Sequence, residues 1–308
     1  MTFRTLLPAA LLLIGCGLHR RPAAPEPARG PARDSLLQLD ATRGDSIAAH
    51  GGVDGALALL APDVAYLRAG IPAVYGRDAA RALFAAGPAA RPGTAAGALP
   101  TWQPLGGGVS SDLRSGFTFG VSAHADTTHP AVRVDRYVAF WQRSTGQPWR
   151  IVAYAEVNAP PSEELKFSAA QLAPPSRPTS RPLAETAGQL RAADSLFSDL
   201  ADRLGTAVAF SSTVAPFGAV FGGTTLVVGS KSVRELYEAG AGTSLTWRPV
   251  YASAAASRDL GFTIGEYIAT GRGPSGAAVQ RFGKYLTVWQ RQPDGSWKFL
   301  IDGGNATR

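Results

Sequence analysis

The sequence predicts a protein of two tandem α+β domains, and three observations support this fold class. The first is a strand hairpin at 283–305, where two apolar, β-prone runs flank the turn residues Pro293-Asp294-Gly295. The second is an earlier copy of this hairpin at 137–158, in which Tyr, Trp, Gln, Arg and Trp recur at the same spacing. The third is the order of elements in each half, where helices and a strand precede a run of strands. Helices segregated from an antiparallel sheet are typical of α+β folds.

The first half is expected to contain three helices and five strands. Apolar residues at helical spacing predict a helix from Asp34 to Ala48 and a second from Val53 to Leu60. A strand at 64–68 follows the break at Pro62-Asp63, and a third helix follows Gly76. Four further strands are expected at 102–110, 116–123, 132–143 and 149–157.

The second half repeats this order after a proline-rich linker. A long helix containing Leu190 and Leu204 stops at Gly205, strand-forming residues follow at 217–228, and a helix is expected at 230–239. Every element of the first half thus has a partner, which indicates domain duplication. The predicted boundaries are a signal peptide at 1–15, a tether at 16–33, a first domain at 34–158, a linker at 159–182 and a second domain at 183–308.

Composition excludes several classes of protein. The chain has 308 residues, 45% of them hydrophobic and 17% charged, with a single cysteine, which is typical of a globular protein without a disulfide framework. The net charge of +7 comes mainly from scattered arginines, and no basic stripe interleaved with aromatic residues is present, so no nucleic-acid partner is expected. No phosphate loop or nucleophile elbow occurs, and the G-x-G-x-x-G match at Gly271 to Gly276 joins two strands and opens no helix, so we expect no cofactor. His124, Asp126 and His129 are better explained as a polar loop than as metal ligands, and no metal site is expected.

The N-terminal residues predict export. An apolar run through Leu11 to Ile14 follows Arg4 and is too short to span a bilayer. Its end, Leu13-Ile14-Gly15-Cys16, resembles the lipobox of bacterial lipoproteins, which implies lipidation of Cys16 and a membrane partner reached through that anchor. Gly17 after the cysteine implies the outer membrane, facing the periplasm or the surface. The alternatives are an uncleaved anchor and a signal peptide cut elsewhere.

The second half also carries a family resemblance. Its motifs are Arg258-Asp259-Leu260-Gly261-Phe262-Thr263-Ile264-Gly265, the strand Gly283 to Trp289, the turn Asp294 to Lys298, and Ile301-Asp302. They resemble the uncharacterised bacterial branch of the nuclear-transport-factor-like superfamily, which includes ketosteroid isomerases and SnoaL-like cyclases. The resemblance implies a strongly bent antiparallel sheet wrapped around helices, forming a cone with a pocket. It implies fold more than function, because enzymes, binding proteins and assembly modules share this cone.

Alternation along the last hairpin predicts two faces. If Gln292 pairs with Ser296, one face carries Tyr285, Thr287, Trp289, Trp297, Phe299 and Ile301, and the other carries Leu286, Val288, Leu300 and Asp302. A carboxylate among leucine and valine side chains would have a raised pKa, as a general base requires. The competing interpretation is a solvated or capped carboxylate at a strand end. The candidate ligand-binding residues are Tyr267, Tyr285, Trp289 and Asp302.

The candidate catalytic residues are Asp259 and Asp302. An isomerase-like mechanism needs a carboxylate to move a proton and a donor such as Tyr285 or Tyr267 to hold an enolate. An Asp between two strands more commonly makes a turn through its own backbone, and Asp112 occupies the same motif position as Asp259 in the first half. Tyr154 stands where Asp302 does, so the first domain lacks this acid.

Three functions follow from these expectations. The leading one is an envelope-anchored lipoprotein that binds a small apolar ligand or a partner protein through cone-shaped pocket domains. The alternative is an isomerase- or cyclase-like enzyme with an Asp acid-base in the second domain. The third is assembly alone, in which the two copies form an intramolecular pseudo-dimer or the chain forms a homo-dimer.

Overall fold

The computed structural model describes residues 26–86, 101–125, 132–157, 182–222, 225–240, 243–273 and 275–307. The predicted signal peptide, Cys16 and nearly all of the predicted linker lie outside these residues, as do the side chains of the His124, Asp126 and His129 group. Within the described ranges, no helix combines the length and the hydrophobicity that a membrane span requires.

In each half, helices and a pair of strands precede a run of four strands, as the sequence broadly predicts. The first half comprises α1 (Glu26–Ala41), α2 (Arg43–Ala49), α3 (Val53–Ala58), β1 (Leu60–Leu67), β2 (Val74–Tyr75), α4 (Arg77–Ala85), β3 (Thr101–Val109), β4 (Ser115–Ala125), β5 (Val132–Gln142) and β6 (Arg150–Val157). The second comprises α5 (Leu183–Leu204), α6 (Thr206–Thr213), β7 (Val214–Gly222), β8 (Thr225–Val228), α7 (Ser230–Ala239), β9 (Ser244–Ala254), β10 (Leu260–Arg272), β11 (Ala278–Arg291) and β12 (Trp297–Ala306). The helix expected from Asp34 to Ala48 is two helices, α1 and α2.

The two sheets have the same topology. The strand order is β2-β1-β6-β5-β4-β3 in the first and β8-β7-β12-β11-β10-β9 in the second. The meanders are antiparallel, whereas β1 pairs with β6 and β7 with β12 in parallel. In each half these are the first long strand and the last strand, which no hairpin connects, so they are free to pair in parallel. Each sheet is therefore mixed. Identical strand orders in both halves establish the tandem duplication at the level of the fold.

The α1 helix starts earlier than the sequence predicts. It begins at Glu26, before the expected start at Asp34, and it includes Pro31. Residues 26–33, which were expected to belong to the tether, are therefore helical. The guanidinium of Arg29 lies 3.1 Å from the carboxylate of Asp259 in the second half, with both side chains buried. A tertiary contact of this kind outweighs the weak local preference of a Pro- and Ala-rich segment.

The long helix α5 is amphipathic and ends where predicted. Its buried residues include Leu190, Asp194, Phe197 and Ala201, which recur at three- and four-residue spacing. Gly205 follows with a φ of 87° and separates α5 from α6. This region of φ is costly for a residue with a Cβ, so glycine permits the sharp change of direction.

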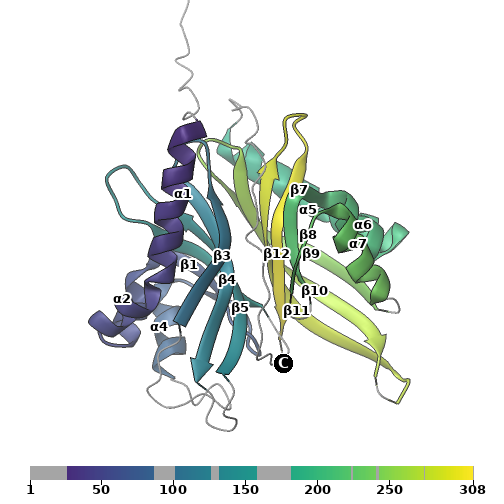
Figure 1. Cartoon of the computed structure of the whole chain (residues 1–308). Helices are drawn as coiled ribbons and strands as arrows, with labels where there is room; N and C mark the ends of the chain where they lie inside the picture. The colour runs from purple at the N-terminus through teal and green to yellow at the C-terminus, as the bar shows by residue number, and fades with distance from the viewer. Residues whose placement is uncertain are drawn as a thin grey trace, which may run out of the picture.

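Helices cover one face of each sheet, and the two sheets pack against each other through their other faces (Figure 1). Under the helices, each cone has its own core, one containing Trp141 and the other containing Trp289. A third core, the inter-sheet core, draws residues from both halves. At its centre the rings of Phe140 and Phe262 lie 4.7 Å apart between centroids. Each sheet is therefore apolar on both faces.

Candidate functional site

The second cone contains a cavity of about 240 Å³. Its walls are mostly aromatic, with one carboxylate, and consist of Phe197, Phe210, Tyr237, Leu245, Trp247, Tyr267, Tyr285, Asp302 and Gly304. The helices α5, α6 and α7 supply one side and the strands β9 to β12 supply the other. An apolar pocket with few polar groups is the usual form of a small-molecule site.

Asp302 faces this cavity because β12 contains a bulge. The register runs from Val288 opposite Ile301 to Trp289 opposite Phe299, which leaves Leu300 as the extra residue. The predicted faces were therefore wrong for two residues. Asp302 shares the cone face with Tyr285 and Thr287, whereas Ile301 joins Leu286 and Val288 in the inter-sheet core.

Burial changes the ionisation of Asp302. Desolvation raises its pKa from 3.8 to about 7, partly offset by a hydrogen bond that the Thr287 hydroxyl donates to the carboxylate, while the nearby charge of Asp194 adds to the increase. The side chain keeps partial access to the cavity. At neutral pH the carboxyl group is therefore present in both its protonated and its ionised form.

A second buried carboxylate, Asp194 on α5, was missed by the sequence analysis. It accepts hydrogen bonds of 2.8 Å from the Tyr285 hydroxyl and from the indole N–H of Trp247. Burial raises its pKa to about 6 against these hydrogen bonds. A signal did exist in the sequence. Asp194 follows Leu190 by the same spacing as Asp40 follows Leu36, and Asp40 likewise accepts a 2.6 Å hydrogen bond from Tyr137.

The predicted ligand-binding residues divide into two groups. Tyr267, Tyr285 and Asp302 line the cavity, and the Tyr285 hydroxyl is held by Asp194. Trp289 is completely buried behind the wall, where its indole N–H donates to the Thr263 hydroxyl over 2.8 Å. The first half repeats this bond between Trp141 and Thr118, so the interaction belongs to the shared core.

The first cone is filled by its own side chains. The guanidinium of Arg43 lies 4.7 Å from the ring centre of Trp102 and 4.8 Å from that of Tyr154, and it pairs with Asp40. The ring of Tyr154 also stacks on that of Tyr66 at 4.8 Å.

The strand register explains why the second cone is open. Tyr66 and Tyr154 are paired in the first sheet, and the corresponding pair in the second sheet is Val220 and Asp302. Two tyrosines are thus exchanged for smaller residues. The position of Arg43, three residues after the buried aspartate, is occupied by Phe197, which packs on Trp247 and Phe210.

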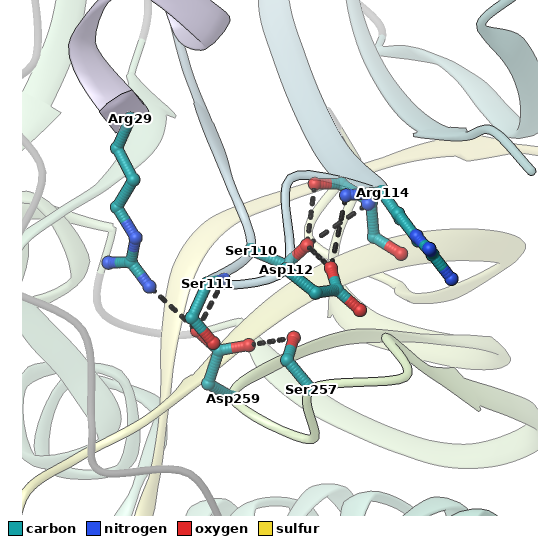
Figure 2. A network of polar contacts seen from close by, with 8 residues as sticks. Arg29, Ser110, Ser111, Asp112, Arg114, Ser257 and Asp259 are labelled. Atoms are coloured by element: carbon teal, nitrogen blue, oxygen red, sulfur yellow. Dashed lines mark hydrogen bonds and ion pairs between the residues drawn. The ribbon is translucent and has the colours of Figure 1, made fainter. Parts of the chain in front are cut away.

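Asp259 lies at the junction of the two halves (Figure 2). Its carboxylate accepts hydrogen bonds from Arg29, from the backbone N–H of Ser111 at 2.9 Å and from the hydroxyl of Ser257. Asp112, at the equivalent position, accepts hydrogen bonds from the Ser110 hydroxyl and the Arg114 backbone N–H. Asp112 thus bonds the backbone of its own turn, whereas Asp259 is held by Arg29 and Ser111 of the first half and by the Ser257 hydroxyl, and it is not among the residues that line the cavity. Among the described side chains, no cluster of three or more His, Cys, Asp or Glu could hold a metal ion.

The fold and cavity define a chain of two cone-shaped α+β domains, the second of them hollow. No protein-family model matches the chain, and the search of curated proteins gives no match. Solved structures similar to about 40% of this chain include nuclear-transport-factor-2-like and ketosteroid isomerase-like proteins, the superfamily that the sequence resembles.

A ketosteroid isomerase-like protein from Erwinia carotovora atroseptica is 17% identical over 40% of this chain and 98% of its own, with a TM-score of 0.36. An NTF2-like protein with a cystatin-like fold from Novosphingobium aromaticivorans is 17% identical over 40% and 82%, with a TM-score of 0.33. An NTF2-like protein of unknown function from Pseudomonas putida is 13% identical over 44% and 97%, with a TM-score of 0.35. Similarity at this level concerns the fold alone and assigns no activity.

Proposed function

We propose that this chain binds a small, mainly apolar molecule in the cavity of its second cone, and that Asp302 recognises a polar group on it. The observation that carries the proposal is the exchange of Tyr66 and Tyr154 for Val220 and Asp302, which opens a space that the first cone fills. A cavity of about 240 Å³ has room for roughly ten non-hydrogen atoms. The aromatic walls favour a flat or cyclic ligand.

The ionisation of Asp302 determines which polar group fits. A carboxyl group with a pKa of about 7 can donate a hydrogen bond to a carbonyl oxygen below that pH and can only accept one above it. Asp194 already accepts from Tyr285 and Trp247, so its role is to fix the tyrosine. The proposed ligand is therefore a compact cyclic molecule with one carbonyl or hydroxyl group.

The test uses 1-indanone, a bicyclic ketone of suitable size, and indane as the matched compound without the carbonyl. The full chain carries Cys16→Ser so that no lipid is attached, and binding is followed by NMR shifts of the Trp247 indole. We expect saturable binding of 1-indanone below pH 7 and weaker binding of indane. The double variant Val220→Tyr, Asp302→Tyr copies the filled cone and should abolish binding. Saturable binding to that variant, or none to the parent chain, would contradict the proposal.

The enzymatic alternative has one specific observation in its favour. Asp302 has a pKa near neutrality and lies in the same cavity as Tyr267, and a base beside a hydroxyl donor is the pairing that proton abstraction next to a carbonyl requires. In this version Asp302 takes the proton and the Tyr267 hydroxyl stabilises the enolate oxygen, because the Tyr285 hydroxyl already donates its hydrogen to Asp194. Hydrogen–deuterium exchange at the carbon beside the 1-indanone carbonyl, measured in D₂O, tests it. Exchange that Asp302→Asn abolishes while binding remains would favour the enzyme, and binding without exchange would favour the binding protein.

We also propose that the protein is anchored in the bacterial envelope through a lipid on Cys16, facing the periplasm or the surface from the outer membrane. The lipobox-like sequence Leu13-Ile14-Gly15-Cys16 supports this location. Metabolic labelling with a fatty acid should mark the protein, and Cys16→Ser should remove the label and release the protein from the membrane fraction. An unlabelled parent chain would refute the anchor without bearing on the cavity.

A further inference from the structure

A second cavity lies outside the cone, between the two halves. It has a volume of about 630 Å³ and lies between the β1–β2 connection of the first half and strands β9, β10 and β11 of the second. Its apolar lining includes Tyr75, Ile264, Ile268 and Phe282. Trp247 and Tyr267 line both cavities, so they form the wall between the cone cavity and this second cavity, which we call the interdomain groove.

One cation lines the interdomain groove in a buried position. Lys284 on β11 is only 3% exposed. Its ammonium donates a hydrogen bond to the side-chain oxygen of Asn305, whose amide nitrogen donates to the backbone oxygens of Leu67 and Glu156 in the first half. Burial lowers the pKa of Lys284 to about 8, so the ammonium is mostly charged at neutral pH. The lysine is thus held in a fixed place by groups from both halves.

The charge of Lys284 is not balanced by an acid within the described residues. Glu266 stands directly opposite it in the β10–β11 register, but its carboxylate is bound to Arg248 at 2.8 Å on the other neighbouring strand. Asn305 is neutral. The interdomain groove therefore combines mostly apolar walls and the Arg248–Glu266 ion pair with the positive charge of Lys284, and a buried charge without a countercharge is costly.

We propose that the interdomain groove binds an aliphatic carboxylic acid, whose carboxylate pairs with Lys284 and whose chain lies along Ile264, Ile268 and Phe282. The bound carboxylate would supply the missing negative charge, and a hydrocarbon chain matches the remaining walls. A volume of about 630 Å³ is ample for a chain of roughly ten carbons. This site is separate from the cone cavity and does not depend on the function proposed for it.

The experiment compares three compounds with the same chain length on the full chain carrying Cys16→Ser. Decanoate, decanol and decyltrimethylammonium are titrated at pH 7 by calorimetry. We expect saturable binding of decanoate that is at least tenfold tighter than that of decanol, and the weakest binding of the cation. Equal affinities for decanoate and decanol, or no saturable binding of decanoate, would overturn the proposal.

Variants locate the site. Lys284→Met should reduce the affinity for decanoate to that for decanol. Phe282→Asp places an acid at an exposed position of the groove without disturbing the core, and it should weaken the binding of decanoate at least tenfold. This variant tests the site even if Lys284→Met fails to fold. Phe217→Asp, at an exposed position outside the groove, should have no effect. The filled-cone variant Val220→Tyr, Asp302→Tyr should still bind decanoate, and loss of binding there would assign decanoate to the cone instead.

Discussion

Replacing Asp302 with Asn should stabilise the second domain at high pH, because it removes most of the folding free energy that the ionised carboxylate costs. Folding raises the pKa of this carboxyl group from 3.8 to about 7, so the folded state binds the proton more tightly than the unfolded state. The native state is therefore destabilised as pH rises from about 4 to about 7, and the loss is complete above pH 7. Asn keeps the shape of the group and the oxygen that accepts from Thr287, but it never ionises.

The magnitude follows from the size of the pKa change. A difference between 3.8 and about 7, at about 1.4 kcal/mol for each pKa unit, gives a ceiling of about 4 kcal/mol. Water entering the cavity screens part of this effect because Asp302 keeps partial exposure, and we expect about 2 kcal/mol at pH 8. Asp194 is present in both proteins, so the difference in stability between the variant and the parent reports the ionisation of Asp302 together with its interaction with Asp194.

Urea unfolding at pH 4, 5, 6, 7 and 8, followed by tryptophan fluorescence, measures this difference. The parent and Asp302→Asn should have similar free energies of unfolding at pH 4 and should diverge progressively toward pH 8, with the variant more stable. Asp199→Asn, an exposed aspartate on the same helix as Asp194, is the control and should follow the parent. If the free energies of unfolding of the parent and of Asp302→Asn changed in parallel with pH, the carboxylate would be solvated, and Asp302 would not be a desolvated group of the cavity.

Three further predictions concern the architecture, and urea unfolding measures each. Gly265→Ala would place a Cβ against the Tyr285 hydroxyl and the Arg248 backbone oxygen and should lower stability by about 1–3 kcal/mol. Gly188→Ala, where a Cβ would meet nothing within 4 Å, should stabilise α5 by up to about 1 kcal/mol. Equal effects of the two variants would contradict close packing at Gly265. Arg29→Met leaves the buried Asp259 carboxylate without its cation and should cost about 3–5 kcal/mol, against less than about 1 kcal/mol for Arg33→Met in the exposed pair with Asp34. A small effect at Arg29 would mean that α1 is not held by this pair. Phe140→Ala opens the inter-sheet core and should cost about 3–5 kcal/mol, while Leu196→Ala at an exposed position should change stability by less than about 0.5 kcal/mol; comparable losses would argue against close packing of the two sheets.

The features that the sequence predicted depend on local chemistry. The hairpin turn at Asp294 forms as expected, with its carboxylate accepting from the Ser296 backbone N–H at 2.9 Å and Gly295 at a φ of 89°. The duplication was visible because the core positions of both halves hold the same aromatic residues. Trp141 and Trp289, for example, make the same hydrogen bond to a threonine on the neighbouring strand. Local turn signals and a repeated core are enough to predict the fold class.

The features that were missed depend on distant contacts. A single extra residue at Leu300 reverses the facing of Asp302, and no local pattern marks a bulge in an apolar strand. The early part of α1 carries Arg29, which forms an ion pair with Asp259, a residue far away in the sequence. Asp194 was overlooked because an acid on an amphipathic helix is usually exposed. Aligning the two halves through Leu36 and Leu190 would have shown that an aspartate recurs at one buried position.

The inter-sheet core has a consequence for how the protein behaves on dilution. Two separate cones that covered each other's apolar faces would dissociate as their concentration fell, and each would expose those faces to water. Here both sheets belong to one chain, so the covering surface is present at a constant effective concentration. The affinity of the second cone for the proposed ligand should therefore be the same in a dilute and in a concentrated solution of the protein.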